Sequence, residues 1–311
     1  MAHDLYLAMY SFGIKKKNTA NHQCVENNLY LSTAYPNEEN KFTTGFVKDL
    51  IDLIDEKVFK NKQDTHGGIL AEKSIKSESR ILDLLIDGGI TGIQQFIINE
   101  DGKKTELSKK KVVGLKFFAR IWLPANTVTG YLFLQKYGSM SIKPLFDSII
   151  KKIIEDKDFT LTNNRLVPTT TKERMKNFLK YSTIRDIVIV SKKSSHETGE
   201  IDAATVSIKL KKITFSNKKT IDKNIIGKAL KNHGFTLGDR HYDIRATYKQ
   251  EVDGYKEEKT FALDGTDETI NFVPNIIIPK FAIDENNYPI FSQMQNFVDE
   301  EIKQIKKEAK L

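Results

Sequence analysis

The sequence predicts an α+β fold in which mainly antiparallel sheets carry single packed helices. Two segments rich in β-branched and aromatic residues, 112–123 and 127–136, flank a turn that contains Pro124, a pattern typical of paired strands. Farther along, Pro144 and Pro289 each precede apolar residues at helical spacing, and proline is favoured in the first turn of a helix. Strand pairs with separate helices between them favour the α+β class.

The first half of the chain contains both strands and helices. Thr44 is placed to cap a helix whose apolar residues recur at helical spacing, and Asp101-Gly102 predicts a hairpin turn. The pairs Gly67-Gly68 and Gly88-Gly89 are interpreted as turn glycines. In order, we expect strands at 5–11 and 29–34, helices at 45–59 and 79–86, a short strand at 96–99, the strand pair above and the helix that begins at Pro144.

A polar stretch, 156–171, is interpreted as a linker between two domains. We therefore expect an N-terminal α+β domain, residues 1–160, and a C-terminal basic α+β domain, residues 161–311. At Lys211-Lys212 the alternation of apolar and polar residues slips, which indicates a bulge or a strand end. In order, we expect a helix at 172–181, strands at 186–191 and 204–210, a helix after Thr220, a hairpin of 242–252 and 258–263 around Asp253-Gly254, a strand at 270–278, and a long amphipathic helix from Pro289 that packs on its own domain or on a second subunit.

Composition excludes several classes of protein. The chain has 311 residues, of which 39% are hydrophobic and 29% charged, so it is long enough for two domains and is not typical of a disordered protein. A single cysteine, Cys24, excludes an internal disulfide framework and an all-cysteine zinc site. No signal peptide and no apolar run of membrane-spanning length are found, so we expect a cytoplasmic protein.

Positive charge is concentrated in one part of the chain. Residues 172–232 hold fifteen Lys and Arg against six Asp and Glu, a net charge of +9, whereas the whole chain carries +8. A concentrated basic segment attracts polyanions, and lysine suits phosphate contact without base readout, so double-stranded DNA is the expected partner. A lysine-rich solvated face that reflects an AT-rich genome is the alternative. The candidate DNA-binding residues are Lys192, Lys193, Lys209, Lys211, Lys218, Lys219, Lys223, Lys228 and Lys231.

Two other functions stay open. Asp243, Glu257 and Lys259 form a loose D…ExK pattern, whose placement in a hairpin is compatible with metal-dependent DNA cleavage, although such matches arise by chance in a chain this rich in charge. Alternatively, the last helix binds a protein partner and the lysines only solubilise the chain. No residue pattern indicates a catalytic nucleophile, a bound metal or a cofactor, so we expect a protein that binds rather than catalyses.

The order of elements resembles that of the RexA-type phage-exclusion proteins and of KwaB, the DNA-binding subunit of the Kiwa anti-phage system. The resemblance rests on the opening aromatic strand 5–11, the central Phe118-Ala119-Arg120 strand, the lysine-rich strand and helix, the late hairpin around Glu251–Tyr255 and the long last helix. It implies a bacterial anti-phage defence protein that binds DNA without marked sequence preference. It also implies a homodimer that acts with a membrane-embedded partner of the same system.

Overall fold

The computed structural model describes residues 5–18, 23–55, 57–174, 183–191, 210–214, 228, 230–234, 242–252, 255–262 and 276–310. The chain forms two compact units: unit 1 consists of residues 1–169 and 275–311, and unit 2 of residues 170–274. The chain thus leaves unit 1 nine residues after the predicted end of the first domain. Residues 275–311, which we assigned to the second domain, return to unit 1, because the apolar face of the last helix completes the core of that unit.

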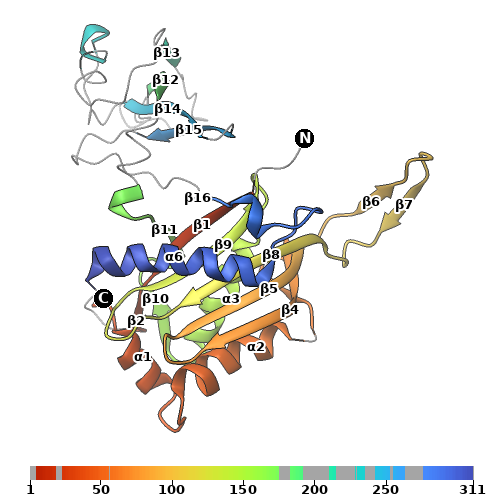
Figure 1. Ribbon diagram of the computed structural model, residues 1–311, viewed down its shortest axis with the longest axis vertical. Coiled ribbons are helices and arrows are strands. Elements are labelled where there is room, and N and C mark those ends of the chain that lie inside the picture. Colours follow the sequence, from red (N-terminus) through yellow and green to blue (C-terminus); the bar gives the residue numbers. More distant parts are fainter. Residues whose placement is uncertain are drawn as a thin grey trace, which may run out of the picture. The chain divides into compact units, whose positions relative to one another are not determined.

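Unit 1 is built on one large sheet in which every pairing is antiparallel, as the predicted α+β class requires (Figure 1). Among the described residues the sheet has eight strands, in the order β11-β1-β9-β8-β5-β4-β3, with β16 also paired to β1. These strands are β1 (Leu5–Phe12), β3 (Phe59–Lys60), β4 (His66–Lys76), β5 (Ile81–Ile90), β8 (Val113–Trp122), β9 (Gly130–Tyr137), β11 (Val167–Pro168) and β16 (Ile276–Ile277).

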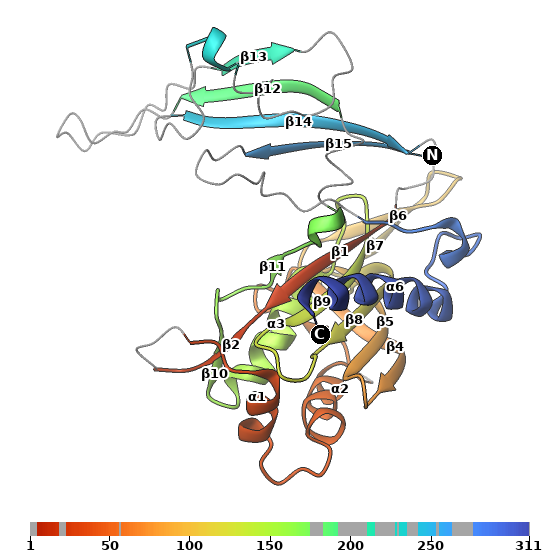
Figure 2. The ribbon, with the colours of Figure 1, turned by 60° about the vertical axis from the view of Figure 1, so that its left-hand side comes forward.

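Helices cover both faces of this sheet. The long helix α6 (Phe291–Ala309) crosses one face, where the ring of Phe291 lies 5.9 Å from that of Phe118 on β8 (Figures 1 and 2). The helix α3 (Lys143–Glu155) packs on the other face, where the Leu145 side chain lies close to Gly68. Smaller helices complete the unit: α1 (Asn27–Ala34), η1 (Lys41–Val47), α2 (Lys48–Ile54) and η3 (Lys280–Ala282).

The central strand pair and the two long helices confirm the sequence predictions. β8 pairs with β9 from Ala119–Leu134 to Trp122–Tyr131, and α3 and α6 begin beside Pro144 and Pro289. In each helix the apolar residues share a buried face because they recur at helical spacing. For α6 that buried face lies in the core of unit 1 of the same chain, and not in the second domain to which we assigned the helix.

Two predicted elements of the first half are wrong in type. Residues 29–34, predicted as a strand, lie in α1, where the adjacent Tyr30 and Leu31 are both buried while Leu29 is exposed. Residues 79–86, predicted as a helix, lie largely in β5. This strand is buried on both faces between α3 and α6, so its apolar run lacks the alternation that identifies a strand.

The helix predicted at 45–59 is shorter and begins earlier. It starts at Lys41 as η1 and ends with α2 at Ile54. The cap is Asn40, whose side-chain oxygen accepts a hydrogen bond of 3.0 Å from the Thr43 N–H, and not the predicted Thr44. The predicted linker at 156–171 also contains β10 (Phe159–Leu161), which pairs with β2 (Ile14–Lys16), and β11.

Unit 2 contains a four-stranded antiparallel sheet in the order β13-β12-β14-β15. The strands are β12 (Thr183–Ser191), β13 (Leu210–Thr214), β14 (Tyr242–Val252) and β15 (Tyr255–Ala262). The predicted hairpin of β14 and β15 and the strand at 186–191 are confirmed. The predicted bulge or strand end at Lys211-Lys212 is wrong, because β13 continues through both residues and pairs with β12 without a register shift.

Several predictions for the second half fall only partly on described residues. Residues 172–174 and 230–232 are helical, which agrees with the helices expected there, and Ile276–Ile277 form β16 in the predicted strand at 270–278. Residues 175–182, 204–209, 220–227 and 263–275 lie outside the described residues.

Candidate functional site

The candidate DNA-binding lysines are only partly described. Lys211 lies in β13, where it is paired with Ile189 of β12. Lys228 and Lys231 are exposed on either side of the buried Leu230, so they extend from the same short helical segment into solvent. The spacing of three residues puts the two ammonium groups on neighbouring positions of one helix surface. Lys192, Lys193, Lys209, Lys218, Lys219 and Lys223 lie outside the described residues.

The backbone register of unit 2 separates the residues of the nuclease pattern. Glu257 pairs with Gln250, and Lys259 pairs with Tyr248. Asp243 lies seven residues before Gln250 on β14, a backbone separation of about 24 Å at ~3.4 Å per residue. Ligands of one metal ion lie within a few ångströms of each other, so these three residues do not assemble a metal site in this unit.

Two further features are absent from the part of the chain that the structure describes. That part contains no group of three or more His, Cys, Asp and Glu residues that is arranged to hold a metal ion. It also contains no helix that is long and apolar enough to span a membrane. His66, on β4, has its pKa lowered by burial, and its Nδ1 lies 3.0 Å from the Thr65 hydroxyl, a local contact.

Glycines from three neighbouring strands meet at one end of β4, β5 and β8 in the large sheet. Gly67 and Gly68 of β4 pair with Gly89 and Gly88 of β5, and Gly89 pairs in turn with Gly114 of β8. A Cβ atom at Gly114 would lie 2.0 Å from the carbonyl oxygen of Gly88, so the strands approach more closely than any side chain allows. The interpretation of the two glycine pairs as turn glycines is therefore wrong, because both pairs lie within strands. Close backbone approach requires Gly89, whereas a Cβ atom at Gly67 or Gly68 would meet neighbouring side chains.

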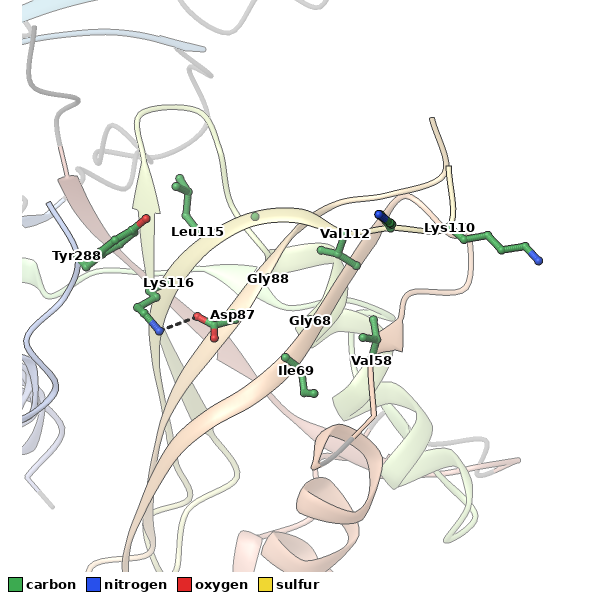
Figure 3. Close-up of a pocket in the computed structure, with 12 residues that line it drawn as sticks. Val58, Gly68, Ile69, Asp87, Gly88, Lys110, Val112, Leu115, Lys116 and Tyr288 are labelled. Carbon is green, nitrogen blue, oxygen red and sulfur yellow. Dashed lines mark hydrogen bonds and ion pairs between the residues drawn. The ribbon is translucent and has the colours of Figure 1, made fainter. Parts of the chain in front are cut away.

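Two hollows lie beside this glycine cluster. The larger, about 730 Å³, has Val58 and Val112 at one end and Tyr288 with the ion pair of Lys116 and Asp87 (3.0 Å) at the other (Figure 3). The second, about 550 Å³, is lined mainly by apolar side chains. Because side chains alternate along a strand, Asp87 and Lys116 lie on the face of the sheet that α6 covers. The residues that line the second hollow, among them Phe117, Met140 and Ile142, lie on the face that α3 covers.

The rim of the larger hollow carries a run of three lysines that the net charge of the surrounding sequence does not reveal. Lys109, Lys110 and Lys111 are all exposed, and no carboxylate in the described part of the chain pairs with their ammonium groups. Figure 3 shows the Lys110 side chain extending away from the glycines. The string of three lysines is visible in the sequence, but nearby acidic residues lower the net charge of its surroundings.

A cluster of buried charges lies under α6. The guanidinium of Arg120, which is 0% exposed, donates hydrogen bonds to both carboxylate oxygens of Asp83 and to Asp299. Lys76 pairs with the second oxygen of Asp299 at 2.9 Å, and Gln295 donates to Asp83 at 2.8 Å. Each carboxylate oxygen is thereby paired, so the cluster fastens α6 to the sheet and leaves no group directed at a ligand.

No protein-family model matches the chain, and neither a curated protein nor a solved structure is found to be similar to it. The resemblance to RexA and KwaB therefore stays a prediction.

Proposed function

We propose that this chain binds double-stranded nucleic acid, above all DNA, through contacts between its lysines and the backbone phosphates. The observation that carries the proposal is the net charge of +9 over residues 172–232, which lie in unit 2. Lys228 and Lys231 support it, because both are exposed and neighbouring on one helical segment. The sequence of residues 172–232 contains few aromatic residues, Phe178, Tyr181 and Phe215, which favours contact with a duplex backbone over stacking of single-stranded bases.

Lysine ammonium groups act here as point charges that displace condensed counterions from the duplex. Affinity is then expected to fall steeply as salt rises, and to depend little on base sequence. Each phosphate contact contributes a slope of about −0.9 in a plot of log affinity against log salt. Loss of two contacts is therefore expected to make the slope less steep by roughly 2.

The test measures binding of the full chain to random-sequence duplexes by fluorescence anisotropy across a salt series. The variant Lys228→Glu/Lys231→Glu is compared with Lys48→Glu/Lys151→Glu, which changes the net charge equally at two ion-paired lysines of unit 1. We expect weaker binding and a smaller salt slope only for the first variant. Equal effects of the two variants would show that binding depends only on the overall charge of the chain. A wild-type protein that does not bind DNA at low salt would refute the proposal.

The resemblance to RexA and KwaB adds a biological setting to this proposal. The chain would act in the bacterial cytoplasm in defence against phage, together with a membrane-embedded partner. The test is the efficiency of plaquing on cells that express the chain with its neighbouring genes. Unchanged plaquing over a panel of phages, with the protein present and able to bind DNA, would remove the defence role and leave the DNA-binding proposal intact.

A further inference from the structure

The second hollow, of about 550 Å³, lies where side chains are missing from one row of the large sheet. Side chains of paired residues form rows across neighbouring strands. On the face that α3 covers, Gly68, Gly88 and Leu115 form such a row, and two of its three members have no side chain. The Leu145 side chain of α3 lies against Gly68, whereas Gly88 borders the hollow. The glycines thus leave a gap in the layer of side chains on this face.

Apolar side chains surround this gap. Ile90 and Val113 belong to the row on one side of it, and Phe117 belongs to the row on the other side. Met140 and Ile142, from the segment that leads into α3, complete the apolar lining. Ile90, Val113 and Met140 are 41%, 41% and 42% exposed. A ligand seated in the hollow would therefore bury apolar surface that the protein by itself leaves in water.

The absence of charge decides which class of ligand fits. In the part of the chain that the structure describes, no Asp, Glu, Lys or Arg residue lines this hollow, and its polar residues are His66, Gln95, Ser139 and Ser141. His66 is neutral at pH 7, because burial lowers its pKa below the usual 6.5. A charged ligand would lose its hydration here without gaining a countercharge, which is costly. The hollow therefore favours a neutral molecule.

The hydrogen bonds around His66 assign the group that it offers to a ligand. The Asn61 side-chain oxygen accepts from the N–H groups of Thr65 and His66, so the Asn61 amide nitrogen donates to the Thr65 hydroxyl oxygen at 3.0 Å. The Thr65 hydroxyl is then left to donate its own hydrogen to the His66 Nδ1, 3.0 Å away. In the neutral imidazole the proton consequently lies on Nε2, which has no partner among the described residues.

We propose that this hollow binds a neutral, flat and largely apolar small molecule that carries one hydrogen-bond acceptor. The backbone of Gly88, Gly89 and Gly114 lines the hollow, and a flat ring can approach bare backbone closely. The acceptor takes the hydrogen bond of the His66 Nε2. The volume agrees with this class, because small-molecule sites usually measure about 300–1,000 Å³ and combine apolar walls with a few polar groups.

The first test titrates the full chain with two fluorescent probes that differ by one charged group. N-phenyl-1-naphthylamine is neutral, and 8-anilino-1-naphthalenesulfonate adds a sulfonate to the same rings. We expect saturable binding of the neutral probe, and a sulfonate that competes for its site with about tenfold or more lower affinity, because the sulfonate would lose its hydration there. A neutral probe that does not bind saturably, or a sulfonate that competes equally well, contradicts the proposal.

The second test fills the hollow. Val113→Trp puts a large ring at a half-exposed strand position that lines the hollow, and it should weaken binding of the neutral probe by about tenfold or more. Ile75→Trp, at a similarly exposed strand position that lines neither hollow, should bind the probe like the wild type. Met140→Trp makes the same test without altering a strand. Unchanged binding to the Val113 and Met140 variants, or an equal loss in Ile75→Trp, would place the probe elsewhere and overturn the proposal.

The third test isolates the hydrogen bond from His66. Prodan is a neutral naphthalene with a ketone oxygen, whereas N-phenyl-1-naphthylamine has no carbonyl acceptor. His66→Phe keeps a ring but removes the Nε2 donor, so the affinity for prodan should fall by about threefold or more, while N-phenyl-1-naphthylamine should bind as it does to the wild type. An equal change for both probes, or no change for prodan, would show that His66 does not supply the hydrogen bond.

Sedimentation equilibrium of the same variants separates a small ligand from a protein partner. If Val113→Trp turned a wild-type dimer into a monomer, the hollow would belong to an interface between two copies of the chain, and the proposal would fail. The proposal does not depend on DNA binding, because the hollow belongs to unit 1, whereas Lys228 and Lys231 belong to unit 2. Loss of DNA binding in the variant of these two lysines should therefore leave binding of the probes unchanged.

Discussion

Arg120 on β8 and Asp299 on α6 form an ion pair although 179 residues separate them in the chain. The pair joins the two parts of unit 1 that flank unit 2 in the sequence. It is continuous with the fully buried pair of Arg120 and Asp83, so the final helix is held by charge as well as by its apolar face.

Replacement of Arg120 should strongly destabilise unit 1. Arg120→Met removes the only cation paired with the 0% exposed Asp83 and leaves it the hydrogen bond from Gln295, and an uncompensated buried charge costs roughly 3–5 kcal/mol. Urea unfolding followed by the fluorescence of Trp122, the single tryptophan, reports on this unit. Lys48→Met, which breaks an exposed ion pair, is the matched control and should change stability little. A similar small loss for Arg120→Met would contradict the role of the cluster.

The contribution of Asp299 should disappear in acid. Partial burial raises the pKa of Asp299, but hydrogen bonding to Lys76 and the charge of Arg120 outweigh it and lower the pKa below the usual 3.8. A lowered pKa in the folded state means stability that is present above about pH 4 and lost as pH falls through the folded-state pKa. The wild type should thus exceed Asp299→Asn in stability at neutral pH, and the difference should shrink below pH ~4. A difference that stays constant with pH would refute this assignment.

The glycine cluster should not tolerate a methyl group. Gly114→Ala places a Cβ atom 2.0 Å from the Gly88 carbonyl oxygen, and the strands must separate, at a cost of more than about 3 kcal/mol. Gly102→Ala is the control: its φ of +79° strains alanine by about 1 kcal/mol, but no atom lies within 4 Å. Thermal unfolding should rank Gly114→Ala well below Gly102→Ala, and the reverse order would show that close approach is not what requires glycine.

Removal of α6 should unfold unit 1. A chain that stops at Tyr288 exposes the apolar core residues that α6 covers and leaves Arg120 without Asp299, so we expect loss of near-ultraviolet circular dichroism and aggregation. A chain that stops at Lys306, after the last buried residue of the helix, Ile305, should stay folded. A folded protein without α6 would revive the hypothesis that this helix serves a partner.

Elements with a clear period were predictable from the sequence. The apolar residues of α3 and α6 recur every three to four positions, and proline marks both starts, so type and bounds followed from local rules. β5 was not predictable in this way, because both of its faces are buried, and Asp83 within it is tolerated only through Arg120 from another strand. The glycine cluster likewise depends on which strands are neighbours.

The candidate site divides in the same manner. Local charge identified the +9 segment, and spacing along a helix predicted that Lys228 and Lys231 lie close together. Spacing alone also suggested Asp243, Glu257 and Lys259 as a group, and the strand register then separated them. The hairpin of β6 (Gln95–Ile98) and β7 (Lys104–Leu107) was predicted from Asp101-Gly102. The exposure of its apolar residues was not, because it depends on which other elements pack against the hairpin.

By itself, therefore, the sequence determined the fold class, the amphipathic helices, the hairpin turns and the location of excess charge, since each depends on neighbours within about one turn or one strand. The tertiary structure alone decided that the last helix returns to the first unit, that β5 is a strand, that the glycines lie within strands, and that β6 stands exposed. These features depend on contacts between residues far apart in the chain, and no local pattern encodes which distant partner supplies the missing burial or charge.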